Sequence, residues 1–342
     1  MIRFRPSVSL ATSLIGILDI MIAFNDDVST LSNDVSRSKR MLSAFAKTWP
    51  NRARVKKEEL VPIFEENKED FLEELLPFKD QARYLSASKE MKSKVLTCGW
   101  IMYNAKTVQI ETEIVAPACS DITAGRLPGL DDPEAQLAAS ETMVDEAYHL
   151  HLVEEANRLT KRWRGMDTLH VPQFHLVGYM KQMQAQMEHA WQRQMIQFCT
   201  AVVSEIFISD YLHLLSENQE IQSFNRQTVE AHRHDEMSHS PLFRSFGKLY
   251  FYNLTEAQQA FCADILPRPV VWFADRELDV WLSLLQQINF PDAEAMIQEC
   301  RDQHEVDLAA LDYAGIVSLA SEIGMLDTKV GRDSFAKQGL LG

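Results

Sequence analysis

The chain has 342 residues, 46% of them hydrophobic, and its 49 acidic residues against 34 basic ones give a formal net charge of −15. This acidic balance argues against nucleic acid or an anionic membrane surface as a partner, because both require basic patches. The five cysteines are scattered and include no Cys-x-x-Cys pair, which indicates core thiols in a reducing, cytoplasmic protein rather than a disulfide framework.

Residues 1–35 stand apart as an N-terminal segment. Two arginines precede an apolar stretch at residues 8–24, as in a signal peptide, but Asp19 interrupts the stretch and no small-x-small cleavage site follows. The stretch is also too short and too charged to span a bilayer. A docked or frayed helix, or an upstream start codon, therefore explains it better than export, and the polar residues 25–39 are expected to be loosely ordered.

Residues 36–342 are expected to form a single all-helical domain. The chain contains only 12 glycines and 12 prolines, and long stretches repeat with a helical period while no alternating strand pattern emerges. A short helix is predicted from Met41 to a stop before Pro50, because the residue ahead of a proline disfavours helical backbone. The tail from Thr328 is expected to be mobile. Helices that only pack against the others are predicted at residues 255–265, 269–288 and 292–324.

Four long helices are predicted to carry the functional residues. The first is expected to end at Pro117, and the third is expected to break once. The second has Pro133 at its first helical position after two aspartates, which favour the positive end of the helix dipole. Pro241 is expected to kink the fourth. The four helices are predicted at residues 88–116, 133–163, 174–216 and 221–252.

Two of these helices carry the same motif, Asp-Glu-x-x-His, at residues 145–149 and 235–239. A Glu and a His three residues apart on a helix point about 60° from each other, so they converge on one spot, and such a spot suits a metal. A lone glutamate precedes each motif, Glu111 in the first case and Glu205 in the second. Both lie on apolar helix faces, where surface acids are rare and a carboxylate needs a partner.

A Glu followed by Glu-x-x-His, occurring twice, is the ligand arrangement of di-iron and di-manganese carboxylate proteins, in which four helices of a bundle point their ligands inward. Four carboxylates balance two divalent cations, whereas four unpaired carboxylates in a core would be prohibitive. The spacing leaves iron and manganese both open. The ligands predicted from this pattern are Glu111, Glu146, His149, Glu205, Glu236 and His239.

The second motif helix offers a further imidazole. His232, Glu236 and His239 are spaced by four and three residues and share one face, which favours His232 as a ligand over a plain core histidine. Asp145 and Asp235 are either acceptors for the N–H of a ligand imidazole on the facing helix or solvated helix acids. An apolar substrate pocket is predicted to include Trp100, Tyr103 and Phe207, for which a place in the core is the alternative.

In these motifs and in the stretches around them, the chain resembles the di-iron arylamine N-oxygenase family. The resemblance covers residues 40–320. It is carried by residues 40–55 with Trp49-Pro50, residues 97–118 (TCGWIMYNAKTVQIETEIVAPA), residues 144–149 (VDEAYH), Ser204-Glu205, and residues 232–239 (HRHDEMSH). It implies a seven-ligand set of four Glu and three His, which falls on Glu111, Glu146, His149, Glu205, His232, Glu236 and His239.

The resemblance implies a homodimeric, ferritin-like four-helix bundle with additional packing helices. It further implies a monooxygenase in which two irons, O2 and an external electron donor convert an amine to a hydroxylamine, nitroso or nitro product in natural-product biosynthesis. Lys106 departs from the family pattern, in which an arginine is expected, and Pro241 is a second departure. Binding of a benzoate carboxylate is therefore not carried over, and a free alkyl amine or an amino acid tethered to a carrier protein is an alternative substrate.

Two other classes of protein fit the same bundle. A di-iron enzyme that hydroxylates or oxidises carbon, or a radical-generating reductase subunit, is disfavoured by the third imidazole and by the resemblance. A non-enzymatic iron-binding bundle is disfavoured by length, because a bare four-helix bundle needs roughly half of this chain.

Overall fold

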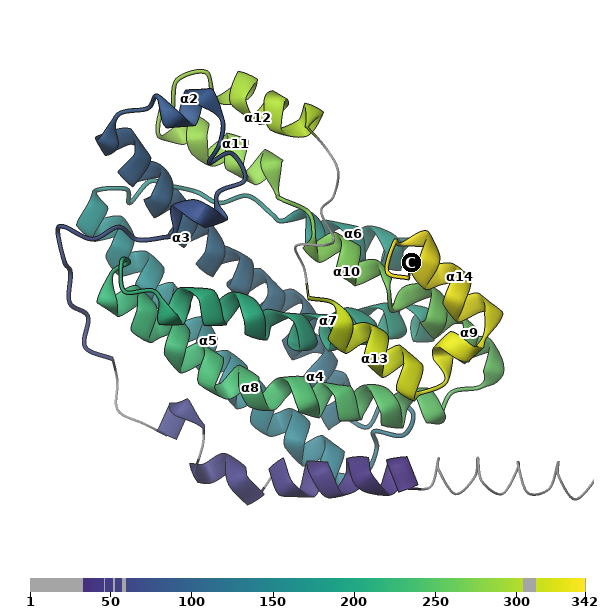
Figure 1. Ribbon diagram of the computed structural model, residues 1–342. Coiled ribbons are helices and arrows are strands. Elements are labelled where there is room, and N and C mark those ends of the chain that lie inside the picture. Colours follow the sequence, from purple (N-terminus) through teal and green to yellow (C-terminus); the bar gives the residue numbers. More distant parts are fainter. Residues whose placement is uncertain (1–32, 46, 52, 57–59, 304–311, 342) are drawn as a thin grey trace, which may run out of the picture.

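The computed structural model describes residues 33–45, 47–51, 53–56, 60–303 and 312–341 (Figure 1). These residues form helices joined by turns, with no strand among them, which confirms the all-α prediction. The expectations for residues 1–32 lie outside the described residues. Residues 33–39 were expected to be loosely ordered but are helical, as are residues 40–45 and 47–51, so the short helix passes Pro50 instead of stopping before it.

The helical segments are numbered in chain order, and Figure 1 labels the α-helices among them. They are η1 (Arg54–Lys56), η2 (Glu73–Leu75), α2 (Ala82–Leu85), α3 (Lys89–Ile110), η3 (Glu111–Val115), α4 (Ala116–Thr123), α5 (Pro133–Arg164), α6 (His175–Ala185), α7 (Ala190–Glu217), α8 (Ser223–Tyr252), α9 (Glu256–Ile265), α10 (Arg268–Phe273), α11 (Leu278–Gln287), α12 (Ala293–Asp302), α13 (Ala314–Glu322), η5 (Met325–Asp327) and α14 (Lys329–Lys337).

The long helices close into a bundle around one interior. α5 packs against α3 and α4 on one side and against α8 on the other, α8 packs against α7, and α7 returns to η3 and α4 (Figure 1). The shorter helices surround this ring, with α6, α9, α10 and α13 against α7 and with the α11–α12 pair at the far end of α3. This arrangement confirms the predicted ferritin-like four-helix bundle with additional packing helices.

Local sequence signals set the ends of these helices. The Ser88 hydroxyl accepts from Met91 N at 3.2 Å at the start of α3, and Asp132 Oδ1 accepts from Ala135 N at 2.9 Å at the start of α5. Both are N-cap hydrogen bonds, which satisfy otherwise unpaired amides of the first turn. The predicted break in the third long helix is also confirmed, because α6 and α7 are separate and α7 begins with a capping box at His189.

The first long helix does not end at Pro117, contrary to the prediction. It continues through a π-helical segment, η3, into α4, and the Ala116 amide donates to the Glu111 carbonyl five residues back. A proline removes one amide donor, which leaves a carbonyl of the preceding turn without its partner. Here Gln197 Nε2 on α7 donates to the carbonyls of Glu113 and Ile114 at 2.9 and 2.8 Å. The neighbouring helix therefore supplies what Pro117 removes.

Other boundaries also differ from the predictions. The tail from Thr328 was expected to be mobile but forms α14, which packs against α9 with the Phe335 ring fully buried. The stretch predicted at residues 269–288 is two helices, because the chain turns between α10 and α11 with Glu277 at a φ of +53°. α8, by contrast, runs through Pro241 as the single helix that was predicted, and the kink at Pro241 stays a prediction.

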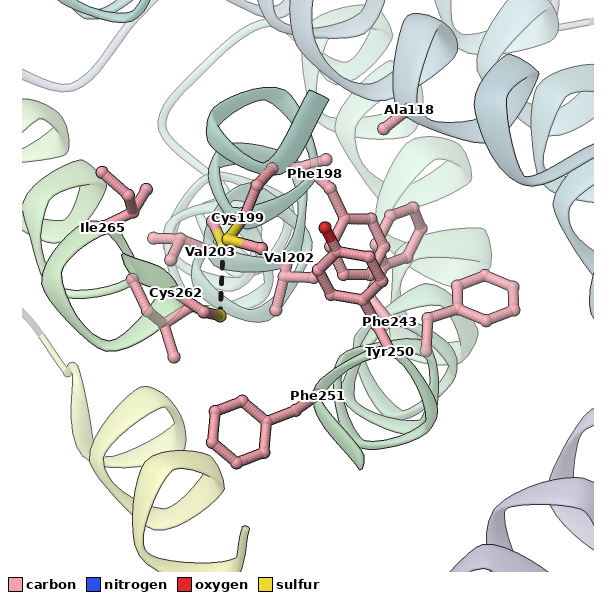
Figure 2. Close-up of a cluster of buried hydrophobic side chains, with 14 of the residues drawn as sticks. Ala118, Phe198, Cys199, Val202, Val203, Phe243, Tyr250, Phe251, Cys262 and Ile265 are labelled. Atoms are coloured by element: carbon pink, nitrogen blue, oxygen red, sulfur yellow. Dashed lines mark hydrogen bonds between the residues drawn. The ribbon is translucent and has the colours of Figure 1, made fainter. Parts of the chain in front are cut away.

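The core beside the bundle is apolar and contains thiols. All five cysteines are free and buried, which confirms the predicted core thiols. Figure 2 shows Cys199 on α7 facing Cys262 on α9, with their sulfurs 3.8 Å apart among aromatic side chains of α7 and α8. α7 is also the one described helix that is long and apolar enough to cross a membrane, but 71% of its most apolar window is buried inside the fold. α7 therefore serves as a core helix of the bundle.

Candidate metal centre

α5 and α8 each carry one Asp-Glu-x-x-His motif into the bundle interior. On α5, the carboxylate of Glu146 and the ring of His149 are buried, and His149 Nδ1 lies 2.8 Å from Glu146 Oε2. On α8, Glu236 and His239 are fully buried, with His239 Nδ1 lying 3.4 Å from Glu236 Oε1. The three-residue spacing thus brings each Glu and His together on one helix face, as the sequence predicts.

The two lone glutamates reach the same interior from the other two helices. Glu111 is the first residue of the π segment η3, and π turns in helices often occur at functional sites. Glu205 lies in the middle of α7, and its Oε2 is 3.5 Å from His239 Nδ1 on α8. Both carboxylates are 1% exposed, so all four glutamates of the predicted set are removed from solvent.

The predicted donors form two groups that share one residue. Within each group, one ligand atom from every residue lies within 4.8 Å of the others. The shared residue is Glu236, so the two groups adjoin. The first group is Glu111, His149, His232 and Glu236, and the second is Glu146, Glu205, Glu236 and His239.

The motif glutamates lie between the two groups. Glu146 directs its two oxygens to different histidines, with Oε2 2.8 Å from His149 Nδ1 and Oε1 3.1 Å from His239 Nδ1. Glu236 Oε1 is 3.2 Å from His232 Nε2 and 3.4 Å from each of the other two imidazole nitrogens. Each of these carboxylates therefore has the position that a bridge between two cations requires.

His232 belongs to this cluster and not to the surrounding apolar core. Its Nε2 lies 3.6 Å from Glu111 Oε1, and its ring centroid is 4.2 Å from that of His149. Burial lowers the pKa of His232, and the neighbouring His149 lowers it further, so the imidazole is held neutral. A neutral imidazole is the form that binds a metal. His234, two residues further along α8, is exposed.

The donor atoms fit cations better than they fit each other. Among the described residues, Oε2 of Glu111, Glu205 and Glu236 is buried and accepts no hydrogen bond. Glu146 Oε1 and His239 Nδ1 are also without hydrogen bonds, although they lie only 3.1 Å apart. Buried polar atoms are rarely left unpaired in proteins, because each costs about 1–3 kcal/mol. Their residues belong to the two donor groups, each of which could hold a metal ion that would satisfy the unpaired atoms and balance the carboxylate charge.

The pKa values of the clustered carboxyl groups also reflect their burial and their mutual repulsion. Burial, together with repulsion from Glu146 and Glu236, raises the pKa of Glu111 and of Glu205 well above its usual value. Burial also acts against ionisation of Glu146, but the adjacent His239 lowers the pKa of Glu146 to about 2. The cluster without metal therefore retains protons on its carboxylates, and metal binding must release them.

The two motif aspartates form an outer layer across the α5–α8 seam. Asp145 on α5 places Oδ2 3.3 Å from His239 Nε2 on α8, and Asp235 on α8 places Oδ2 3.4 Å from His149 Nε2 on α5. Both aspartates are fully buried, so they are not solvated helix acids. Of the two alternatives that the sequence left open, the structure therefore has the one in which each aspartate accepts from an imidazole on the facing helix. Such acceptors fix the tautomer and orientation of ligand imidazoles.

Neither N–H donor to these aspartates was predicted from the sequence. The Trp49 indole Nε1 donates to both oxygens of Asp145, at 2.9 and 3.0 Å. The backbone amide of Arg54 donates to both oxygens of Asp235, at 3.2 Å each. Both donors are more than 90 residues away in sequence from their acceptors. No spacing rule could have found them, because the docking of the chain around residues 49–54 against α5 and α8 decides the contact.

The predicted substrate-pocket residues do not form one cluster. Trp100 and Tyr103 stack on each other with centroids 5.6 Å apart in the core near α11 and α12, and Trp100 is fully buried. Phe207 instead stacks on Phe273 in the core around α7 and α9. The structure gives each of them packing partners, and their contact with substrate stays a prediction.

Lys106, the departure from the family pattern, already has an anionic partner. Its Nζ lies 3.4 Å from Glu277 Oε1, and the Glu277 carboxylate is buried. A cavity of about 400 Å³ opens nearby between α3 and α5, with Ala105 and polar side chains such as Asn157, Arg158 and Lys161 in its lining. None of the three predicted pocket residues lines this cavity.

Two comparisons with known proteins agree with the geometry of the site. The family described as "P-aminobenzoate N-oxygenase AurF" matches residues 36–324. A 4-aminobenzoate N-oxygenase of Streptomyces thioluteus is 25% identical over 299 residues, which cover 84% of this chain and 87% of the relative. The match spans every helix of the bundle and all seven clustered donors.

Proposed function

The chain belongs to the P-aminobenzoate N-oxygenase family and is an N-oxygenase, and from this premise we propose that its bundle interior holds two iron ions. Residues 36–342 then form one oxygenase domain. Four carboxylates balance the charge of two divalent ions, and a set of carboxylate and imidazole donors suits iron. The proposed ligands are Glu111, Glu146, His149, Glu205, His232, Glu236 and His239.

Bound iron supplies the redox chemistry that activates O2 for transfer of oxygen to an amine nitrogen. The residues of the chain arrange the conditions for that transfer. Asp145 and Asp235 accept the Nε2 protons of His239 and His149, so that Nδ1 of each ring is directed toward the carboxylates and the iron. Glu236 belongs to both donor groups, and the two oxygens of Glu146 face a histidine of each group, so these two carboxylates would help to hold both ions.

Burial of the cluster excludes bulk water from the reacting atoms. All seven proposed ligands are at most 2% exposed, and the surrounding layer on the α7 and α8 side is apolar. A water-poor site strengthens electrostatic interactions and protects reactive species from side reactions. An amine nitrogen must be neutral to offer its lone pair, and an apolar surround favours the neutral form of an amine over its ammonium ion.

The proposed substrate class is wider than the 4-aminobenzoate that the name of the relative gives. Lys106 faces the buried carboxylate of Glu277, so its charge is already compensated within the fold. A substrate carboxylate would have to compete with Glu277 for this cation. We therefore propose a small amine that does not depend on a free benzoate carboxylate, including an alkyl amine or an amino acid tethered to a carrier protein.

The observation that carries the proposal is the third imidazole, His232, in contact distance of both Glu111 and Glu236. A cluster of four Glu and two His would serve equally well for carbon oxidation or for iron storage. The additional donor on α8 separates this chain from those alternatives, in agreement with the family match.

Isotope labelling tests the proposal directly. Iron-loaded, reduced protein is exposed to labelled O2 with a panel of aryl amines, alkyl amines and carrier-tethered amino acids, and the products are analysed by mass spectrometry. We expect label on nitrogen, as a hydroxylamine, nitroso or nitro compound, and none with Glu236→Ala. Label found only on carbon, with amines that bind, would assign the chain to the carbon-oxidising class.

The remaining assignments concern partners. We propose an external electron donor, either a protein or a small reductant, because placing one oxygen atom of O2 on the amine and reducing the other to water requires two electrons that the amine does not supply. We propose a homodimer on the basis of the family resemblance, and a cytoplasmic location on the basis of the free, buried cysteines. Light scattering of the purified protein, which distinguishes 39.1 kDa from twice that mass, tests the dimer.

A further inference from the structure

The N-terminal strap, defined as the described residues between 33 and 56, lies along the outside of the bundle beside α8 (Figure 1). It is anchored far from the metal centre, where Asp34 accepts from Tyr252 OH at 3.2 Å and lies 3.4 Å from Lys248 Nζ. Leu42 of the strap is fully buried in the main core cluster. The strap is therefore docked by charge and by apolar contact before it reaches the α5–α8 seam.

The end of the strap meets both outer aspartates. η1 packs against α5 and against α8. The Trp49 indole and the Arg54 backbone amide donate to the aspartate on α5 and the aspartate on α8, respectively. Each donor is shared by both oxygens of its carboxylate, at distances that differ by no more than 0.1 Å within a pair. Asp145 on α5 and Asp235 on α8 are therefore held in the same way by neighbouring residues of the strap.

The chemistry of these donors constrains the imidazoles. An indole N–H and a backbone N–H can only donate, so each buried aspartate must act as an acceptor toward the strap. With the carboxylate fixed in that orientation, its Oδ2 also accepts from the ligand histidine of the facing helix. The other ring nitrogen of that histidine is then the one directed at the carboxylate cluster. Contacts of this outer kind set the basicity and orientation of metal-bound imidazole.

We propose that the N-terminal strap positions the metal centre, with Trp49 acting through Asp145 on His239 and the Arg54 amide acting through Asp235 on His149. Trp49 is a positioning residue in this scheme, because it touches neither metal nor substrate. The inference builds on the proposed two-metal site. It adds that the site is completed by a segment outside the four-helix bundle, whose docking adjusts both imidazoles together.

Cobalt binding separates this role from simple packing. Two variants remove one donor each: Trp49→Phe keeps an aromatic ring without the N–H, and Arg54→Pro removes the backbone N–H. Their matched controls are Trp191→Phe, at a tryptophan on α7 that stacks near His189, and Arg54→Ala, which keeps the backbone N–H. The affinity for Co²⁺ is measured by chelator competition, the ligand-field absorption of the bound Co²⁺ is recorded, and the unfolding midpoint of the metal-free protein is measured in urea.

We expect Trp49→Phe and Arg54→Pro to lower the Co²⁺ affinity about tenfold each and to shift the ligand-field bands, while both controls bind like the wild type. Wild-type affinity and spectra in both donor variants, with or without a lower unfolding midpoint, would overturn the inference and leave the two-metal site intact. Failure of the wild type itself to bind two Co²⁺ ions per chain, or full binding by Glu236→Ala, would instead overturn the proposed function.

Discussion

The candidate metal centre is built from two unlike halves. The α5–α8 half carries both Asp-Glu-x-x-His motifs, and its histidines are held from behind by aspartates that are themselves held by the strap. The α3–α7 half contributes the lone glutamates Glu111 and Glu205, each with one buried oxygen that accepts no hydrogen bond within the described residues. Carboxylate oxygens without a hydrogen bond occur in both halves, since Glu146 Oε1 and Glu236 Oε2 share this property, but only the α5–α8 half has its histidines held by outer aspartates. The difference indicates a rigid platform facing an adjustable pair of carboxylates.

Loss of metal gives the largest contrast between the halves. Glu236 belongs to both donor groups, whereas Glu205 belongs to one. We expect Glu236→Ala to reduce the iron content from about two per chain to well under one, because both positions lose a ligand, and Glu205→Ala to retain about one. Elemental analysis of protein grown with iron measures both values. Equal losses in the two variants would abolish the distinction between platform and adjustable half.

The second largest effect is expected for His232, because it lies where the two halves meet. It contacts Glu111 of the adjustable half and Glu236 of the platform. His232→Ala should lower turnover of an accepted amine about tenfold or more, while the remaining ligands retain iron and the thermal midpoint changes little. His234→Ala, at an exposed position on the same helix, is the matched control. Unchanged turnover in the His232 variant would make it a core histidine.

The π segment that carries Glu111 offers a test of how the adjustable half is supported. Gln197→Leu removes the amide that satisfies the Glu113 and Ile114 carbonyls, and leaving such groups unpaired should cost about 1–3 kcal/mol of unfolding free energy. The control is Gln287→Ala, which removes an exposed amide bound to the His170 carbonyl. Urea denaturation compares the two. A cost no larger than that of the control would mean that the π turn does not depend on α7.

The smallest effect is expected outside both halves. Burial is the largest single influence on Glu322 and disfavours its charge, but hydrogen bonds and attraction from Lys248 and Arg244 together outweigh it and lower the pKa of this carboxyl to about 2. Its contribution is therefore present at neutral pH and is lost as the pH falls from about 4.5 toward 2. Because the group is partly exposed and screened, Glu322→Gln should cost only about 0.5 kcal/mol at pH 7 and nothing near pH 2. Urea titrations at both pH values, with iron content as a second readout, check this independence from the metal site.

The sequence predicted what depends on spacing along one helix. The Glu and His pairs, the addition of His232 and the helix start at Pro133 are all local, and the structure brings the first two sets together and begins α5 at Pro133. Beyond the convergence of the ligands, several features that depend on a second helix were not predicted. Pro117 was expected to end a helix because it lacks an amide donor. The Gln197 side chain that replaces this donor lies on α7, so no signal near Pro117 reveals it. In the same way, α14 is ordered because Phe335 packs on α9, which no local signal near Thr328 reveals.

The outer donors show the same limit more strongly. The Asp residues could be identified as possible acceptors from their place beside the ligand glutamates, but the alternatives stayed open because burial is a property of the packed seam. Trp49 was visible in the sequence only as part of a family-like stretch. Its contact with Asp145 joins segments 96 residues apart and follows from the docking of the strap.

The π turn at Glu111 also affects how the long first helix meets its neighbour. One extra residue in a turn shifts the angular position of everything beyond it by about 100° relative to a regular helix. α3 and α4 both pack against α5, but the helical positions that face α5 follow a different register in α4 from that in α3. A single helical wheel cannot describe this rod. Sequence alignments across residues 111–115 should therefore permit a one-residue gap, and any graft of the site onto another bundle must transfer the extra residue with the glutamate.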